Sequence, residues 1–334
     1  MSIPYQNLAI ANTIGFNREF YEAVQYDTSQ LEQIISNANK KISRDKYGLV
    51  NYIGTTELVS KTAEYQQSQP DALTISQREY RWNTFKKQLT YSRDIVKQSG
   101  QTFGTEAFFQ TQNMTELKNA IARAKEKAIF DAIAAKTTDI KADNVRETFD
   151  ILGTASLQKK YTIWADAAGT SAGTSAESGT KTGLTVEKIV LAKGLMRLNN
   201  KSISFNQPYL LITENEKVHL LNDAKAINFD FTSKRTLDGG DIEAILGVRF
   251  ITLDPSFFKV TGPENNKVRD LYMITPETMA IAKPEEPLWK TGENSGAEFQ
   301  PIVHLEFSYG ATRIRDEQFL RIRVAVNPNE LLSS

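Results

Sequence analysis

The chain has 334 residues, enough for a sizeable core or for two domains, and its forty basic and forty acidic side chains cancel. This balance excludes nucleic-acid or anionic-membrane binding that depends on net charge. The absence of cysteine excludes disulfides, thiolate nucleophiles and sulfur-based zinc sites. The first residues lack the features of a signal peptide, and no window holds the roughly eighteen apolar residues of a membrane span, so we expect a soluble, non-exported chain.

The first ninety residues contain few side chains that could form a core. Residues 15–42 show a weak helical pattern that includes Leu31 and Ile35, and this pattern predicts an N-terminal arm. Residues 44–91 are polar and strand-like, with YGLVNYIG, LTISQREY and RWNTFKKQL separated by turn residues. They predict a long β-hairpin, which is marginal alone in water and therefore needs a partner surface, such as another copy of the chain.

A long helix is predicted at about residues 114–135, a rod of roughly 30 Å. Asn113 and Glu116 have the spacing of a capping box at its start. Apolar residues then recur at helical spacing: Leu117, Ile121, Ala124, Ala128 and Ala132, with Ile129 and Ile133 beside them. The other face carries Lys118, Arg123, Lys125, Glu126 and Lys127, and we expect it to be solvated.

Residues 150–183 are poorly patterned and end in GTSAGTSAESGTKTG, which predicts a flexible loop. Gly179, Lys181 and Thr182 do not form a phosphate-binding loop, because Thr180 separates the glycine from the lysine and no buried strand precedes them.

A compact α/β segment follows this loop. It begins with a helix at 185–199 that has Leu191, Leu195 and Leu198 on one face. A strand is predicted at 209–213, and Thr213 with Glu216 forms a capping box for the next helix. Further strands are predicted at 242–253 and 271–274.

The C-terminal stretch 307–326 reads as strand, bend and strand. Leu320, Ile322 and Val324 alternate with Arg321 and Arg323, the period of a half-buried strand. Upstream, apolar residues at 303, 305 and 307 alternate with polar ones, and Gly310 interrupts the run. We expect a two-stranded antiparallel ribbon.

Groups that could carry catalysis are sparse. His219 and His304 are the two histidines, and neither lies in a pattern that supplies a nucleophile and an orienting group. Pairs of adjacent acids, Glu285 with Glu286 and Asp316 with Glu317, point to different sides of a strand or helix and are expected to be surface charges. The sequence predicts no catalytic, cofactor or metal site.

The order of polar hairpin, long helix, α/β insert and returning strands resembles the major capsid proteins of tailed bacteriophages, of the Hong Kong ninety-seven type. The resemblance runs from about residue 15 onward. It is carried by YGLVNYIGTTELVSKT, ALTISQREYRWNTF, GLTVEKIVLAKGLMRLNN, PYLLITENEKVHLLND and SYGATRIRDEQFLRIRV.

The resemblance implies an α+β major capsid fold with five segments. These are an N-terminal arm (1–43), an extended β-hairpin loop (44–92), a peripheral domain with a long spine helix (93–150), an axial α/β domain (151–290) and peripheral return strands (291–334). It also implies a non-enzymatic virion protein that forms hexamers and pentamers of an icosahedral head. That head encloses double-stranded DNA without sequence-specific contact.

The implied partners are other copies of the chain, a portal protein and, in some relatives, a decoration protein. The chain starts without a long helical extension, which favours a separate scaffolding protein. We expect assembly in the host bacterial cytoplasm.

Dense charges of both signs suggest contacts between subunits. The candidate contact residues are Arg78, Arg81, Trp82, Arg313, Arg315, Asp316, Glu317, Arg321 and Arg323. An exposed face of mixed charge explains the C-terminal members equally well. Two alternative functions remain open from the sequence: an encapsulin-like compartment that holds protein cargo, and a soluble α/β enzyme of unknown activity.

Overall fold

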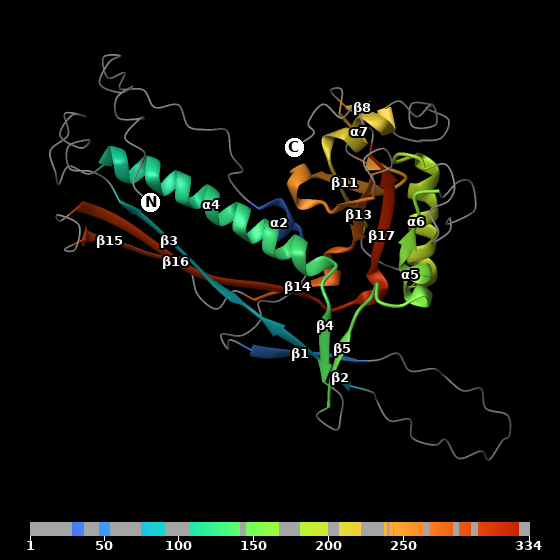
Figure 1. Ribbon diagram of the computed structural model, residues 1–334, viewed down its shortest axis with the longest axis horizontal. Coiled ribbons are helices and arrows are strands. Elements are labelled where there is room, and N and C mark those ends of the chain that lie inside the picture. The colour runs from blue at the N-terminus through green and yellow to red at the C-terminus, as the bar shows by residue number, and fades with distance from the viewer. Residues whose placement is uncertain are drawn as a thin grey trace.

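The computed structural model describes residues 29–36, 47–53, 75–90, 107–140, 145–166, 181–199, 207–221, 237–238, 241–242, 244–262, 267–282, 287–294 and 300–326. Figure 1 shows a long helix lying along a layer of strands, a compact α/β lobe at one end of it, and a small sheet that projects below. The architecture is α+β, as the sequence predicts. No helix among these residues is long and apolar enough to cross a membrane.

The long helix is α4, Ala107–Ile133. It starts seven residues before the predicted start, so Asn113 lies inside the helix and the predicted cap at Asn113 is wrong. At 1.5 Å per residue its 27 residues span about 40 Å. Its buried face carries Leu117, Ile121, Ile129 and Ile133, as the apolar spacing predicts.

The strand layer beside α4 is built on β16, Gln300–Arg313. Strands β3 (Asn83–Thr90) and β15 (Leu288–Asn294) pair antiparallel with opposite edges of β16, and β14 (Met279–Ala282) pairs antiparallel with its last residues. The predicted single hairpin over 44–91 is therefore only half right, because its last stretch pairs with β16, more than 200 residues away.

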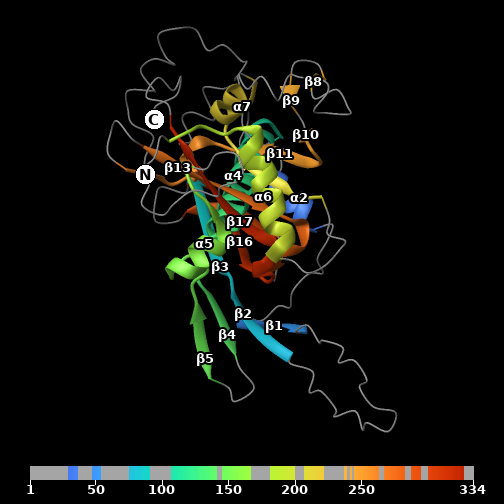
Figure 2. The ribbon, with the colours of Figure 1, turned by 90° about the vertical axis from the view of Figure 1, so that its right-hand side faces the viewer.

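The remaining part of that prediction is confirmed. Strands β1 (Tyr47–Ile53) and β2 (Ile75–Arg81) pair antiparallel along their whole length. The ribbon is extended by β4 (Thr137–Ile140) and β5 (Arg146–Phe149) into a four-stranded sheet in the order β1-β2-β4-β5. This sheet projects away from the rest of the chain in two perpendicular views (Figures 1 and 2).

The compact lobe contains a seven-stranded mixed sheet. Its main order is β10-β11-β7-β13-β17-β6, and β12 pairs with β13. The strands are β6 (Thr162–Ile163), β7 (Tyr209–Ile212), β10 (Ala244–Ile245), β11 (Val248–Thr252), β12 (Val260–Thr261), β13 (Val268–Ile274) and β17 (Phe319–Ala325). All seven residues of β13 are buried, which makes β13 the centre of this core.

Short helices surround that sheet. Helices α5 (Ala155–Tyr161) and α6 (Val186–Asn199) lie beside β6 and β17 (Figure 1), and α7 (Glu214–Leu221) follows β7. Half of the predicted capping box of α7 is confirmed: the Thr213 amide donates to Glu216 Oε2 at 2.9 Å, while the Thr213 hydroxyl donates to the same carboxylate. Three 3₁₀ turns, η1 (Pro255–Phe257), η3 (Pro276–Thr278) and η4 (Asp316–Gln318), and the small ribbon β8 (Leu237–Asp238) with β9 (Asp241–Ile242) complete the described elements.

The predicted C-terminal ribbon is wrong. Strands β16 and β17 do not pair with each other, because η4 lies between them and β17 enters the other sheet, between β13 and β6. Gly310 does not end the strand. A Cβ there would lie 2.2 Å from the Arg81 carbonyl oxygen, so glycine is required by the close approach of the β2–β3 junction.

The N-terminal arm is represented by α2, Gln30–Ser36. Leu31 and Ile35 are buried in the core, and Glu32 pairs with Lys125 of α4 at 3.2 Å. Glu126, which we expected to be solvated, is buried beneath this helix, where the amides of Gln30 and Leu31 face its carboxylate. Burial raises the pKa of Glu126, and the two amides oppose that shift.

Candidate functional site

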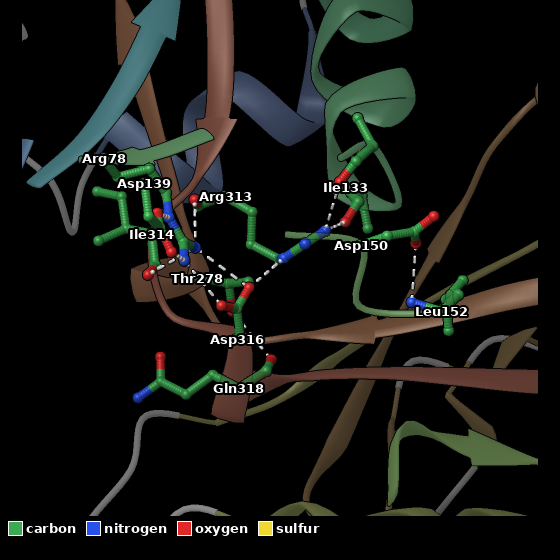
Figure 3. A network of polar contacts seen from close by, with 11 residues as sticks. Arg78, Ile133, Asp139, Asp150, Leu152, Thr278, Arg313, Ile314, Asp316 and Gln318 are labelled. Carbon is green, nitrogen blue, oxygen red and sulfur yellow. Dashed lines mark hydrogen bonds and ion pairs between the residues drawn. The ribbon is translucent and has the colours of Figure 1, made fainter. Parts of the chain in front are cut away.

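Arg78 of β2 is the centre of a buried polar cluster. The residue is only 1% exposed, and its side chain binds two carboxylates (Figure 3). Its Nε and Nη2 donate to the two oxygens of Asp139 at 2.6 and 2.9 Å. Nη1 and Nη2 donate to the two oxygens of Asp316 at 3.1 and 2.9 Å. The planar guanidinium thereby joins β4 to η4.

Arg313, at the end of β16, is the second cation of this cluster. Its Nε donates to Asp316 Oδ1 at 2.6 Å, and its Nη1 donates to the carbonyls of Ile133 and Ala135. The Ile133 carbonyl is at the C-terminus of α4, where the helix dipole favours a positive charge, and Ala135 lies two residues beyond it. Arg313 also lies 5.3 Å from the ring centroid of Phe319. We call Arg78, Asp139, Arg313 and Asp316 the Arg78 junction.

The Arg78 junction is neutral, with two cations and two anions. Burial opposes the charge on Arg78, but the hydrogen bonds and charges of Asp139 and Asp316 outweigh it and raise the pKa of Arg78. For Arg313, burial prevails over the Asp316 charge and lowers the pKa. The carbonyls of Arg313 and Ile314 take further hydrogen bonds from Arg78, at 3.0 and 3.1 Å. The arrangement therefore joins four chain segments and has the chemistry of a structural joint.

The remaining candidate contact residues are more accessible. Arg81, Arg315 and Glu317 are exposed, and Trp82 is half-buried. Arg81 pairs with Glu79 at 3.0 Å, and Arg315 pairs with Glu277. Sequence reasoning grouped these residues with Arg78, but the fold separates a buried set from an exposed one.

Arg321 and Arg323 lie on the seven-stranded sheet and share one acidic partner. Asp270 of β13 accepts from Arg323 Nε at 2.9 Å and pairs with Arg321 at 3.5 Å. Both guanidinium groups lie over the Trp164 ring, at 5.8 and 5.5 Å. Sequence reasoning missed Asp270 and Trp164, because no local pattern connects them to β17.

A second missed ion pair is fully buried. Arg269 Nη1 donates to Glu216 Oε1 at 2.7 Å, so the residue that caps α7 also holds β13. The sequence identifies Glu216 through the predicted capping box. It does not identify Arg269, because that cation is more than fifty residues away.

The groups considered for catalysis are not assembled into a site. His304 lies 3.7 Å from Glu306 on the exposed part of β16, and His219 lies beside Gly183. The ranges that the structure describes contain no group of three or more possible metal ligands. Gly179, Glu285 and Glu286 lie outside the described residues.

Comparison with known proteins agrees with the architecture. The model of the family described as phage capsid protein matches residues 11–326. No curated protein sequence matches the chain. Among solved structures, the capsid of Ralstonia phage GP4 is similar with a TM-score of 0.63 at 10% identity, covering 94% of this chain and 95% of that one.

Two further structures cover almost the whole chain. The head structure of Helicobacter pylori bacteriophage KHP40 has a TM-score of 0.62 at 11% identity, covering 97% of this chain and 99% of that one. The capsid of cyanophage P-SCSP1u has a TM-score of 0.59 at 13% identity, with 95% of each chain covered. The shared fold is the Hong Kong ninety-seven type that the sequence resemblance implies, and the enzyme alternative is wrong. Since the family model spans nearly all of its length, the chain belongs to the phage capsid protein family, as a structural protein of the virion shell.

Proposed function

We propose that copies of this chain form closed rings of six and of five, and that these rings close into an icosahedral head around double-stranded DNA. The observation that carries the proposal is the projecting sheet in Figures 1 and 2. Strand β4 pairs with β2 only at residues 77–79, so most of the β1–β2 ribbon has two strands. A two-stranded ribbon is marginal in water, which supports a neighbouring copy as its partner surface.

The exposed residues at the base of this ribbon are proposed to contact the next copy. Arg81, Arg315 and Glu317 offer both signs of charge, and the half-buried Trp82 lies beside Arg81. We propose an indirect role for the Arg78 junction, whose charges are satisfied within the chain: it sets the direction in which the ribbon projects. Arg321 and Arg323 stabilise the seven-stranded sheet.

The chain's balanced charge suits enclosure of DNA without sequence-specific contact. We further propose a separate scaffolding protein, a portal protein and, as an optional addition, a decoration protein as partners. Assembly would take place in the host bacterial cytoplasm, before the shell becomes part of the virion.

The test shortens the connection between β1 and β2. Residues 54–74 are replaced by Asn-Gly, a two-residue turn suited to hairpins, which leaves β1 and β2 intact. Wild type and variant are expressed with and without a candidate scaffolding protein, then measured by light scattering and negative-stain microscopy. We expect rings or shells from the wild type and a folded, unassembled chain from the variant.

The control is Lys86→Ala on β3, which removes only an accessible ion pair with Glu306 of β16. Normal shells from the shortened chain would contradict a role in assembly for residues 54–74, which connect the two strands of the ribbon. A wild-type chain that stays monomeric or dimeric under both conditions would contradict the assembly itself.

A further inference from the structure

Helix α6 is apolar on two sides. One side packs on the sheet through Val186, Ile189, Ala192 and Met196. The other side is exposed, yet it carries Val190 at 50% and Leu198 at 80% exposure, while Leu191 and Leu195, at its margin, pack partly against the core. Figure 2 looks onto this side of α6, which is the outermost element there. A helix face in water normally carries polar side chains, so this face suggests a partner.

Gly194 lies in the middle of the exposed face. A Cβ at this position would meet no atom within 4 Å, so the fold of the single chain does not require glycine here. Glycine inside a helix is less favourable than alanine. A glycine on a contact face allows another backbone to approach closely, which gives this residue a purpose if a second chain docks there.

The charge on this face indicates what the partner carries. Arg197, in the last turn of α6, is exposed on this face, whereas Lys193 Nζ donates to the Leu246 carbonyl of the same copy. Burial first, and then the charge of Arg197, lower the pKa of Lys193. A complementary surface is therefore apolar with an acidic group. The chain itself presents one on α7, where Glu214 and Val218 are 68% and 49% exposed. Four residues apart on a helix, they share one face.

These two surfaces are separated within one copy. The end of α6 is held at α5, since Asn199 Nδ2 donates to the Lys160 carbonyl at 2.9 Å. Helix α7 lies near the other end, where the His219 ring is beside Gly183. Leu198 lies twelve positions after Val186, a rise of about 18 Å along the helix. A contact between Leu198 and the Glu214–Val218 face of α7 is therefore a contact between two copies.

We propose that the exposed face of α6 docks on α7 of the next copy in the ring. Contact between two different surfaces is heterologous, and a heterologous contact is the type that closes into rings. Arg197 and Glu214 give complementary charge, while Val190, Leu198 and Val218 give apolar area. This inference rests on the proposed assembly into rings and names one of its contacts.

The first experiment uses the absence of native cysteine. The double variant Leu198→Cys with Val218→Cys is assembled, oxidised and run on a denaturing gel, beside each single variant. We expect a ladder of cross-linked copies from the double variant and none from the single variants. Dimers from Leu198→Cys alone, without a ladder from the double variant, would show an α6–α6 contact and overturn the proposal.

The second experiment is Leu198→Asp, with Val260→Asp as control because Val260, in β12 at the side of the seven-stranded sheet, is also exposed. We expect Leu198→Asp to keep the wild-type circular dichroism and to lower the yield of assembled particles at least about tenfold. Val260→Asp should assemble as the wild type does. If the wild type assembles and Leu198→Asp assembles equally well, the proposed α6–α7 contact is wrong, but the proposed assembly into rings is not contradicted. If the wild type never assembles, both the α6–α7 contact and the proposed function are contradicted.

Discussion

At the scale of single residues, the Arg78 junction has the largest energetic consequences. It joins β2, β4, the end of β16 and the last carbonyl of α4 through one pair of arginines and one pair of aspartates. A buried ion pair adds little net stability, because desolvation offsets the attraction between charges. Removing one member is different, since the remaining charges are left buried without a partner.

We therefore predict that Arg78→Ala lowers the free energy of unfolding by about 3–5 kcal/mol. Arg78→Lys should recover only part of this loss, because an ammonium cannot donate in two planar pairs to Asp139 and Asp316. Denaturant unfolding of the unassembled chain measures both variants. The control is Lys86→Ala on exposed β3, which should change stability by less than about 1 kcal/mol. A similar small effect for Arg78→Ala would contradict a structural role for the junction.

Gly310 and Gly194 form a second residue-scale test with opposite expected signs. A Cβ at Gly310 would lie 2.8 Å from Cα of Trp82 and still nearer the Arg81 carbonyl, so Gly310→Ala must displace backbone. We expect Gly310→Ala to destabilise the chain by about 2 kcal/mol or more. Gly194→Ala has open space and should stabilise α6 by roughly 1 kcal/mol. Thermal unfolding at low protein concentration compares the midpoints of the two variants with that of the wild type. Equal midpoints for Gly310→Ala and the wild type would show that β16 does not need its glycine.

At the scale of elements, Lys188 holds α6 to the seven-stranded sheet. The residue is fully buried, and its Nζ donates to the carbonyls of Ala165, Thr182 and Arg323 at 3.0, 2.8 and 3.3 Å. Burial lowers the pKa of Lys188 to about 7, and the charge of Asp166 opposes this shift. One ammonium group thus connects the segment after β6, the start of α6 and β17.

The lowered pKa of Lys188 gives a pH prediction. Between about pH 7 and 10.5 the unfolded chain binds more protons at this residue than the folded chain, so folding stability rises with pH. The slope from this single group approaches about 1.4 kcal/mol per pH unit. Lys188→Met should lose this rise, whereas Lys127→Met, at an exposed position on α4, should keep it. Denaturant unfolding at pH 7, 8 and 9 checks the difference, and parallel curves for all three proteins would contradict it.

At the scale of the whole molecule, the chain combines a continuous hydrophobic core with the β1–β2 ribbon, which projects beyond that core. The α4–β16 layer and the seven-stranded sheet share a continuous core, while the β1–β2 ribbon projects beyond it (Figure 1). A ribbon ordered by neighbours links folding to assembly, because any partner that binds only the folded state stabilises it by mass action.

We predict that the thermal midpoint of the wild-type chain rises with protein concentration once rings form. The chain with residues 54–74 replaced by Asn-Gly should unfold at one temperature at all concentrations. Differential scanning calorimetry over a hundredfold range of concentration measures both. A concentration-independent midpoint for assembled wild type would show that neighbours add no stability to the folded chain.

Much of the element order could be predicted from local pattern. The helical spacing of Leu117, Ile121 and Ile129 identified the buried side of α4, and Thr213 with Glu216 identified the start of α7. The alternation in β17 was also visible. These signals depend on residues within a few positions of one another, and helix and strand periods impose them directly.

Partners and burial were decided only by the tertiary structure. The residues of β3 and β16 are more than 200 positions apart. The sequence of each strand does not predict whether it pairs with a hairpin neighbour or with a distant strand. Arg78 and Glu126 look like surface charges in sequence, yet both are buried, because Asp139 and Asp316 reach one and α2 covers the other. Periodicity determines which way side chains point, but the energy of a strand pair or a buried charge depends on groups that only folding brings together.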